Sequence, residues 1–237
     1  MPAASNVITQ ARSDPADLSW RWLYRLGAVA AIVNVLIIPI QIIVFMVSPP
    51  PELITDWFAH LIDNPLMALL NLDLLYLVNN ALMIVIYLAL FVALRSLHRS
   101  AIWVALVTGL VGITAYFPTN TAFEMLALSQ QYATADAAQQ AILLGAGQAL
   151  TIKYVGTAFI AYYLLNAVAL LLFAWVMLRS PHFSKVAAYA GLIAGVLMLV
   201  PTPFGTIGLL FGFVSLLPWS VFSVLVARSF MKLAQPV

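Results

Sequence analysis

Six long apolar stretches dominate the pattern of hydrophobic and polar positions along the chain. None of them contains Asp, Glu, Lys or Arg, and each supplies close to the ~20 residues that a helix needs to cross a ~30 Å hydrocarbon core. Within lipid the backbone must satisfy its own hydrogen bonds, so such stretches are expected to be helical. They run from Leu26 to Pro51, Leu74 to Leu94, Ser100 to Phe123, Tyr154 to Leu178, Val186 to Pro203 and Phe204 to Ala227. The pattern therefore predicts an all-α polytopic membrane protein with six transmembrane helices.

The composition agrees with this fold class. The chain is 64% hydrophobic and 8% charged, with a mean hydropathy of +1.04, whereas soluble domains are about a quarter charged. The first apolar stretch is too long for the apolar region of a signal peptide, so we interpret it as a retained span. The chain has no cysteine, which excludes disulfides, thiolate metal ligands and cysteine-held clusters.

The basic residues predict the orientation. If the N-terminus is cytoplasmic and there are six spans, every lysine and arginine except Lys153 falls on the cytoplasmic side, as the positive-inside rule requires. This places a cytoplasmic tail at residues 1–19, a six-span membrane domain at 20–233 and a cytoplasmic C-terminus at 234–237. Both termini are then cytoplasmic. A net charge of +2 without a basic face gives no indication of a nucleic-acid partner.

A short repeat suggests how the spans are grouped. The segments LRSLHRS (94–100) and LRSPHFS (178–184) share five of their seven residues, and each connects an inward span to the following outward span. The repeat predicts three in-out-in hairpins in series. Ser100 and Ser184 are the expected N-caps of the helices that follow.

Two predicted outer segments, 51–65 and 119–150, lie between spans. The second is about thirty residues of helix-compatible sequence, in which Thr134 and Asp136 mark the start of a second helix. We expect these segments to form an external helical cap. A simple packed connector is an alternative of equal standing.

Polar residues inside the apolar stretches predict a funnel open to the outside. At 1.5 Å per residue, Asn80 lies about 22 Å and Asp73 about 33 Å above the cytoplasmic Arg95. Asp73 is therefore expected at the outer lip. On a helical wheel Asp73, Tyr76, Asn80, Met83 and Tyr87 share one face. The remaining polar residues of the funnel are Gln41, Tyr162 and Tyr163 at the level of Asn80, with Asn34 and Asn166 beneath.

Lys153 is expected to have a carboxylate partner, because an unpaired charge beside lipid is costly. Asp73 and Glu124 are the only carboxylates at a comparable depth. Lys153 and its carboxylate partner form either a charged opening that binds a polar or zwitterionic head group, or a salt bridge that holds the outer helices against the bundle. The predicted ligand-binding residues are Asp73, Asn80, Glu124, Gln131, Lys153, Tyr154 and Tyr163.

Recognisable catalytic chemistry is sparse. The three histidines are far apart along the chain, and no zinc-protease, nucleophile-elbow, P-loop or dinucleotide-binding motif occurs. A carboxyl group at an apolar lip has the raised pKa that general-base catalysis can use, so Glu124 or Asp73 in a membrane enzyme remains an interpretation. It is less favoured than a protein without catalysis. No catalytic residue is assigned, and the sequence identifies no cofactor.

The second half of the chain resembles a bacterial membrane-protein family catalogued as domain-of-unknown-function family 4386. The resemblance rests on FEMLALSQQYA (123–133), LLGAGQAL (143–150), GTAF (156–159), VMLRSPHFSKVAAYAG (176–191) and LVARSFMKL (225–233). It implies a bacterial inner-membrane protein with a polytopic helical fold. It implies no activity, cofactor or catalytic residue.

Three functions are consistent with the sequence. The leading one is an inner-membrane protein with an outward-facing polar pocket that binds a small amphipathic molecule or lipid. A further version of this hypothesis is that the protein also transports the bound molecule. The second is a non-catalytic accessory or assembly subunit that meets a membrane partner. The third is the carboxylate enzyme. A cavity reaching Asn80 from the outer side distinguishes the first, because a centre filled with side chains would exclude it.

Overall fold

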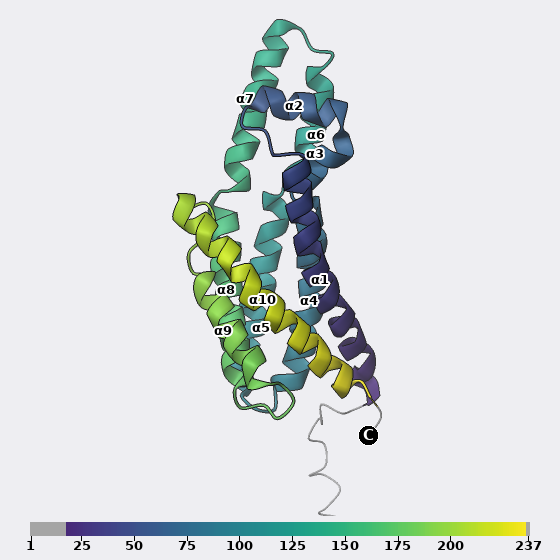
Figure 1. Ribbon diagram of the computed structural model, residues 1–237. Coiled ribbons are helices and arrows are strands. Elements are labelled where there is room, and N and C mark those ends of the chain that lie inside the picture. Colours follow the sequence, from purple (N-terminus) through teal and green to yellow (C-terminus); the bar gives the residue numbers. More distant parts are fainter. Residues whose placement is uncertain (1–17, 236–237) are drawn as a thin grey trace, which may run out of the picture.

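The computed structural model describes residues 18–235, and every regular element in that range is a helix (Figure 1). The predicted all-α class is confirmed. The predicted tail, residues 1–19, lies outside the described residues except for 18 and 19, which begin η1. The helices are η1 (Leu18–Trp20), α1 (Arg21–Val47), α2 (Ile54–Asp63), α3 (Pro65–Asn71), α4 (Leu74–Leu94), α5 (Arg99–Tyr116), η2 (Phe117–Thr119), α6 (Ala122–Tyr132), α7 (Ala137–Tyr154), α8 (Thr157–Met177), α9 (Lys185–Leu197) and α10 (Gly205–Leu233).

Five helical segments are long and apolar enough to cross a membrane: Arg21–Val47, Leu74–Leu94, Arg99–Tyr132, Ala137–Met177 and Gly205–Leu233. The fifth stretch that the sequence marks as a span forms only the 13-residue α9. At 1.5 Å per residue α9 is about 20 Å long, shorter than a ~30 Å hydrocarbon core. Beyond it the chain is non-helical over 198–204, because Pro201 and Pro203 lack the amide hydrogens that a helix requires.

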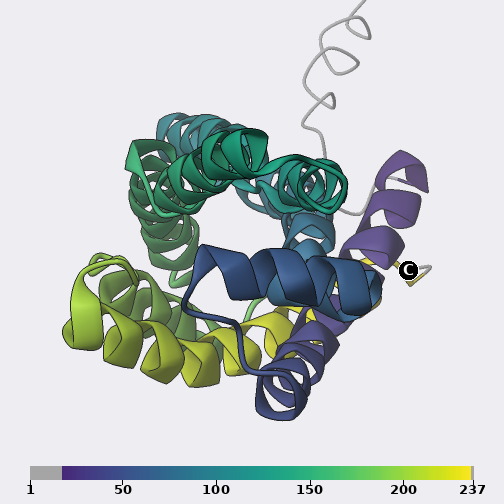
Figure 2. The same ribbon diagram turned by 90° about the horizontal axis from the view of Figure 1, so that it is seen from above.

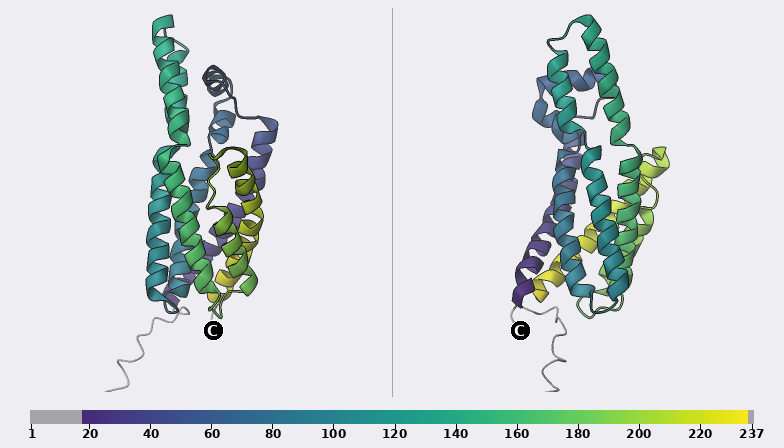
Figure 3. Two further views of the ribbon diagram at one scale, coloured as in Figure 1. Left: turned by 90° about the vertical axis from the view of Figure 1, so that its left-hand side faces the viewer. Right: turned by 180° about the vertical axis from the view of Figure 1, so that it is seen from behind.

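Six helices form an elongated bundle, and four others lie at one of its ends. Helices α1, α4, α5, α8, α9 and α10 make the bundle, while α2, α3, α6 and α7 form what we call the upper helical layer (Figures 1 and 3). Both ends of the described chain lie at the opposite, lower end. Helix α5 packs along α8, α1 contacts α4 and α10, and α9 contacts α8 and α10.

The upper helical layer has a small apolar core of its own. Trp57, Phe58 and Leu61 of α2 are buried against α6, where Met125 is fully buried. The rings of Phe58 and Tyr132 meet edge to face with centroids 5.3 Å apart. These contacts tie α2 to α6, so the two predicted outer segments form one helical layer.

The apolar core fills the lower half of the bundle. Large side chains from five helices are fully buried there, with Tyr24 stacked on Phe230 at 5.9 Å. Glycine allows the closest approach: a Cβ on Gly109 would lie 2.5 Å from Tyr87 Cε2, and one on Gly112 would lie 2.5 Å from Asn166 Nδ2. Helix α5 therefore lies close to α4 at Gly109 and to α8 at Gly112, and a larger side chain does not fit at either position.

Helices α5 and α9 both follow loops at the lower end of the bundle, but a different type of residue caps each of them. Ser184 is the N-cap of α9, because its hydroxyl accepts a hydrogen bond from the Ala187 amide at 3.1 Å. That prediction is confirmed. The prediction for Ser100 is wrong: α5 begins at Arg99, so His98 occupies the cap position and its Nδ1 accepts from the Ala101 amide at 3.3 Å.

Candidate functional site: a cavity between α1, α4, α8 and α10

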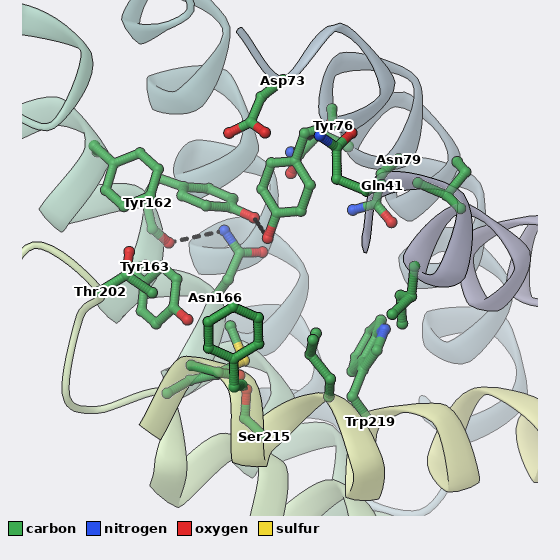
Figure 4. A pocket seen from close by; sticks show the side chains of 18 of the residues that line it. Gln41, Asp73, Tyr76, Asn79, Tyr162, Tyr163, Asn166, Thr202, Ser215 and Trp219 are labelled. Carbon is green, nitrogen blue, oxygen red and sulfur yellow. Dashed lines mark hydrogen bonds between the residues drawn. The ribbon is translucent and has the colours of Figure 1, made fainter. Parts of the chain in front are cut away.

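A cavity of about 380 Å³ occupies the upper half of the bundle. Its walls come from α1, α4, α8 and α10, with the non-helical segment 198–204 contributing Thr202 (Figure 4). The volume lies in the range of small-molecule sites in proteins. The cavity extends from Asp73 and Tyr154, where α4 and α8 begin, down to Asn80 and Asn166.

Asp73 lies at a break between two helices. Its φ of 58° and ψ of 35° are left-handed, and it is the one non-glycine residue with positive φ among residues 18–235. Aspartate tolerates this conformation better than most residues. The Asn120 amide supports the break, because its Nδ2 donates to the Leu72 carbonyl at 2.8 Å. The turn ends α3, starts α4 and directs the Asp73 carboxyl group toward the cavity (Figure 4).

The second break, between α7 and α8, supplies the partner of Asp73. The Tyr154 hydroxyl donates a hydrogen bond to the Asp73 carboxylate. Burial raises the pKa of Asp73 from its ordinary 3.8 to about 6, and the bond from Tyr154 lowers it in part. A carboxyl group with this pKa is mostly ionised at neutral pH and protonated in mild acid.

Aromatic rings surround the cavity below Asp73. The Tyr162 hydroxyl donates to the Tyr76 hydroxyl at 3.1 Å, and the two rings meet edge to face (Figure 4). Phe159 lies 6.3 Å from the Tyr154 ring and 5.9 Å from the Tyr163 ring, measured between centroids. All of these rings line the cavity.

Amides form the lower part of the polar wall and are held rigidly. Asn80 Nδ2 donates to the Tyr76 carbonyl at 2.9 Å, and Asn166 Nδ2 donates to the Tyr162 carbonyl at 2.9 Å. Tyr87 in turn donates to Asn166 Oδ1 at 2.8 Å. These bonds fix the orientation of both amides before any ligand arrives.

The opposite wall is mainly apolar. Helix α1 contributes Ile37, Ile42 and Phe45, while α10 contributes Phe213 and Trp219. Two polar side chains interrupt this wall, Ser215 of α10 and Gln41 of α1. Gln41 donates from Nε2 to the Leu70 carbonyl at 3.1 Å. Its buried Oε1 receives no hydrogen bond from any residue in the range 18–235. The cavity therefore has a polar side on α4 and α8 and an apolar side on α1 and α10.

Four of the seven predicted ligand-binding residues line this cavity: Asp73, Asn80, Tyr154 and Tyr163. The structure does not bring the other three to it. Glu124 and Lys153 are exposed, and Gln131 lies at the end of α6 in the lining of a separate pocket between α6 and α7. The predicted α4 face is correct, since Tyr76, Met83 and Tyr87 also line the cavity.

The predicted ion pair of Lys153 is wrong. Among the described residues no carboxylate lies within salt-bridge distance of its ammonium group. The reason is angular: successive side chains on a helix point about 100° apart, so Tyr154 faces Asp73 while Lys153 points outward. The depth counted along the helices placed Asp73 and Lys153 at the same level, the outer edge of the membrane. It could not show in which direction each side chain points.

Four further residues complete the walls, and none of them has a distinctive pattern in the sequence. Phe159, Thr202, Ser215 and Trp219 line the cavity, but in the sequence each is one of many residues compatible with a membrane helix. In the part of the chain that the structure describes, no group of three or more histidine, aspartate and glutamate side chains could hold a metal ion.

Together the fold and the site define a helical protein with several segments suited to crossing a membrane and a cavity between them. Comparison with known proteins adds no identification, since no family model, curated protein or solved structure matches the chain. The resemblance to domain-of-unknown-function family 4386 stays a prediction.

Proposed function

We propose that this chain is a six-span bacterial inner-membrane protein whose cavity binds a small amphipathic molecule or lipid from the outer side. The carrying observation is the cavity itself, which reaches Asn80 and Asn166 from Asp73 and Tyr154. In a subunit whose polar residues only hold helices together, no cavity beside those residues is needed. Here the hydrogen-bonded polar residues also line a space large enough for a ligand.

The two kinds of wall indicate the kind of ligand. Amide and phenol groups on α4 and α8 can hydrogen-bond a polar head, while the side chains of α1 and α10 offer apolar contact. A purely polar solute would leave the apolar wall in contact with water, and a pure hydrocarbon would leave Gln41 Oε1 without a hydrogen-bond donor. An amphipathic molecule satisfies both walls.

The proposed sixth crossing consists of α9 and the segment 198–204. Non-helical backbone within a membrane is tolerated where it lines a cavity, and Thr202 of this segment lines this one. Arg95, Arg99, Arg179 and Lys185 cluster at the connections of the lower end, which supports a cytoplasmic lower end. The cavity mouth would then face outward.

Single cysteines test this topology, and the natural chain contains none to interfere. Gln131→Cys lies in the upper helical layer, and Ser100→Cys lies at the lower end. In intact spheroplasts, a membrane-impermeant thiol reagent should label Gln131→Cys and spare Ser100→Cys until the membrane is opened. Labelling of Ser100→Cys alone would reverse the orientation and contradict an outward-facing mouth.

The cavity is tested by a matched pair on α10. Ser215 lines the cavity, whereas Ser223, two turns further, is buried in the core outside it, and both are at most 5% exposed. Thiols react as thiolates, which form only where water reaches them. In nanodiscs, neutral methyl methanethiosulfonate should modify Ser215→Cys far faster than Ser223→Cys. Equal rates, or no reaction at Ser215→Cys in a protein with unchanged unfolding temperature, would overturn the proposal.

A further inference from the structure

We infer that the cavity selects a ligand with a cationic head group, an amine or a quaternary ammonium, held between Asp73 and the aromatic rings beneath it. The inference rests on the proposed function and names its ligand class. The apolar part of the ligand would lie against α1 and α10. Charge, ring chemistry and the end of α9 each support it.

The charge inside the cavity has one sign. Asp73 is the sole Asp, Glu, Lys or Arg among the described residues that line it. Lys153, which directly precedes Tyr154 in the chain, is exposed and makes no ion pair with a described residue. An ionisable group at a membrane edge is costly unless something compensates it. Tyr154 supplies a hydrogen bond but no positive charge, so a cation is the missing partner.

The rings around Asp73 suit a cation as well as a tail. Tyr154, Phe159, Tyr76 and Tyr162 line the cavity on the side of Asp73, and neighbouring centroids lie 5.9 to 6.3 Å apart. Aromatic faces attract ammonium groups, and cages of such rings bind quaternary ammonium ligands. An anionic head would gain no cation–π attraction from the ring faces and would be repelled by Asp73.

Helix α9 adds a weaker contribution of the same sign. It starts at the lower end and stops at Leu197, and Met198 and Thr202 just beyond its C-terminus line the cavity. The last carbonyls of a helix carry a partial negative charge. Because α9 ends early, its negative C-terminal end lies beside the cavity. In a helix that crossed the whole membrane, this end would lie beyond the cavity.

The apolar side leaves room for a tail. Helices α1 and α10 meet near the lower end, where Tyr24 stacks on Phe230, and diverge above it (Figure 1). Between their upper halves the cavity is lined by Ile42 and Phe213. Viewed from above, the helices of the bundle are arranged in a ring (Figure 2). The head would lie at Asp73 and the tail between α1 and α10.

The test measures the charge preference of the cavity with two reagents of opposite charge. Ser215→Cys in nanodiscs is treated with the trimethylammonium-ethyl and sulfonato-ethyl methanethiosulfonates. Each rate is divided by the rate of the same reagent with free 2-mercaptoethanol. The normalised rate of the cationic reagent is then divided by that of the anionic reagent. This ratio does not depend on the thiolate fraction of the cysteine. We expect the cationic reagent to be favoured by roughly tenfold, as one charge at short range in a partly aqueous cavity produces.

Two variants assign the preference to its source. Asp73→Asn should reduce the ratio to about one, because asparagine fits the same left-handed turn without the charge. Lys153→Gln, which changes an exposed charge outside the cavity, should keep it. A ratio near one in the parent Ser215→Cys protein, or an unchanged ratio in Asp73→Asn, would overturn the inference. If Asp73→Asn fails to fold, the parent ratio at low pH, where Asp73 is protonated, replaces it.

A competition experiment tests ligands that combine a charged head group with an apolar tail. Hexyltrimethylammonium should protect Ser215→Cys from neutral methyl methanethiosulfonate at lower concentration than hexanesulfonate does, and Asp73→Asn should remove the difference. Equal protection by the two would overturn the cationic head but leave the cavity in place. A cysteine at 215 that no reagent reaches would instead overturn the proposed function, so the two failures are distinguishable.

Discussion

The carboxyl group of Asp73 should make the protein less stable as the pH rises, and Asp73→Asn should remove this effect. The residue directly precedes α4, is partly buried and has a pKa of about 6 in place of 3.8. A folded state that raises a carboxyl pKa binds the proton more tightly than the unfolded state does. The resulting stabilisation is complete below the ordinary pKa and is lost as the pH rises through about 6.

The size of the effect follows from the two pKa values. Each unit of difference corresponds to ~1.36 kcal/mol, so the values 3.8 and about 6 give roughly 3 kcal/mol over the whole window. About half of this, ~1.4 kcal/mol, falls between about pH 5 and about pH 8. Asp73 is only partly buried, and solvent screening reduces the figure to about 1 kcal/mol. For a chain of this length that is about 2–4 °C in unfolding temperature.

Thermal unfolding in one detergent, followed by tryptophan fluorescence, measures it. The quantity is the unfolding temperature of the wild type minus that of Asp73→Asn. It should fall by about 2–4 °C between about pH 5 and about pH 8. Asp63→Asn removes an exposed carboxyl of α2 and serves as the control, for which the difference should stay constant. A difference for Asp73→Asn that is flat, or that rises with pH, would refute the assignment of a partly buried carboxyl group with a raised pKa beside the cavity.

Two further substitutions test the walls. Tyr154→Phe removes the hydrogen bond that lowers the pKa of Asp73, so this pKa should rise above about 6. The measurement is the pH at which the charge preference of Ser215→Cys is half lost. An unchanged midpoint would show that the bond does not form. Gly112→Ala would place a Cβ 2.5 Å from Asn166 Nδ2, and such overpacking should cost about 1–3 kcal/mol and lower the unfolding temperature. Its control is Gly145→Ala on exposed α7, where a Cβ meets nothing within 4 Å and helix propensity predicts a gain of about 0.5–1 kcal/mol. Equal effects of the two alanines would contradict the close packing of α5 and α8.

The polar side of the cavity could be predicted from the sequence because helical periodicity is strict. The positions of Asp73, Tyr76, Asn80 and Tyr87 recur on one face, and a polar face in an apolar helix must turn inward. Counting residues from the arginine that follows each span also predicted the same level for Asn80 and Tyr163, and both line the cavity. Depth and face along one helix are local properties, so a sequence pattern contains them.

Other features depend on contacts between distant segments, which no local pattern contains. The break at Asp73 is supported by Asn120, far along the chain. The direction of Lys153 depends on where α7 ends relative to Asp73. The stretch from Val186 to Pro203 has the composition of a span, yet it forms a short helix and a cavity wall. The composition of this stretch favours a membrane span, whereas α9 ends at Leu197, just before the turn that leads to Pro201 and Pro203.

Native mass spectrometry of the gently purified protein tests the central claim most directly, that the cavity holds an amphipathic ligand. The wild type should retain a bound small molecule or lipid. Ser215→Trp, which fills the cavity from α10, should lose it. Leu217→Trp places the same side chain on α10 at a position that is 75% exposed, and it should retain the ligand. A wild type without bound mass, or equal retention by both tryptophan variants, would contradict the account.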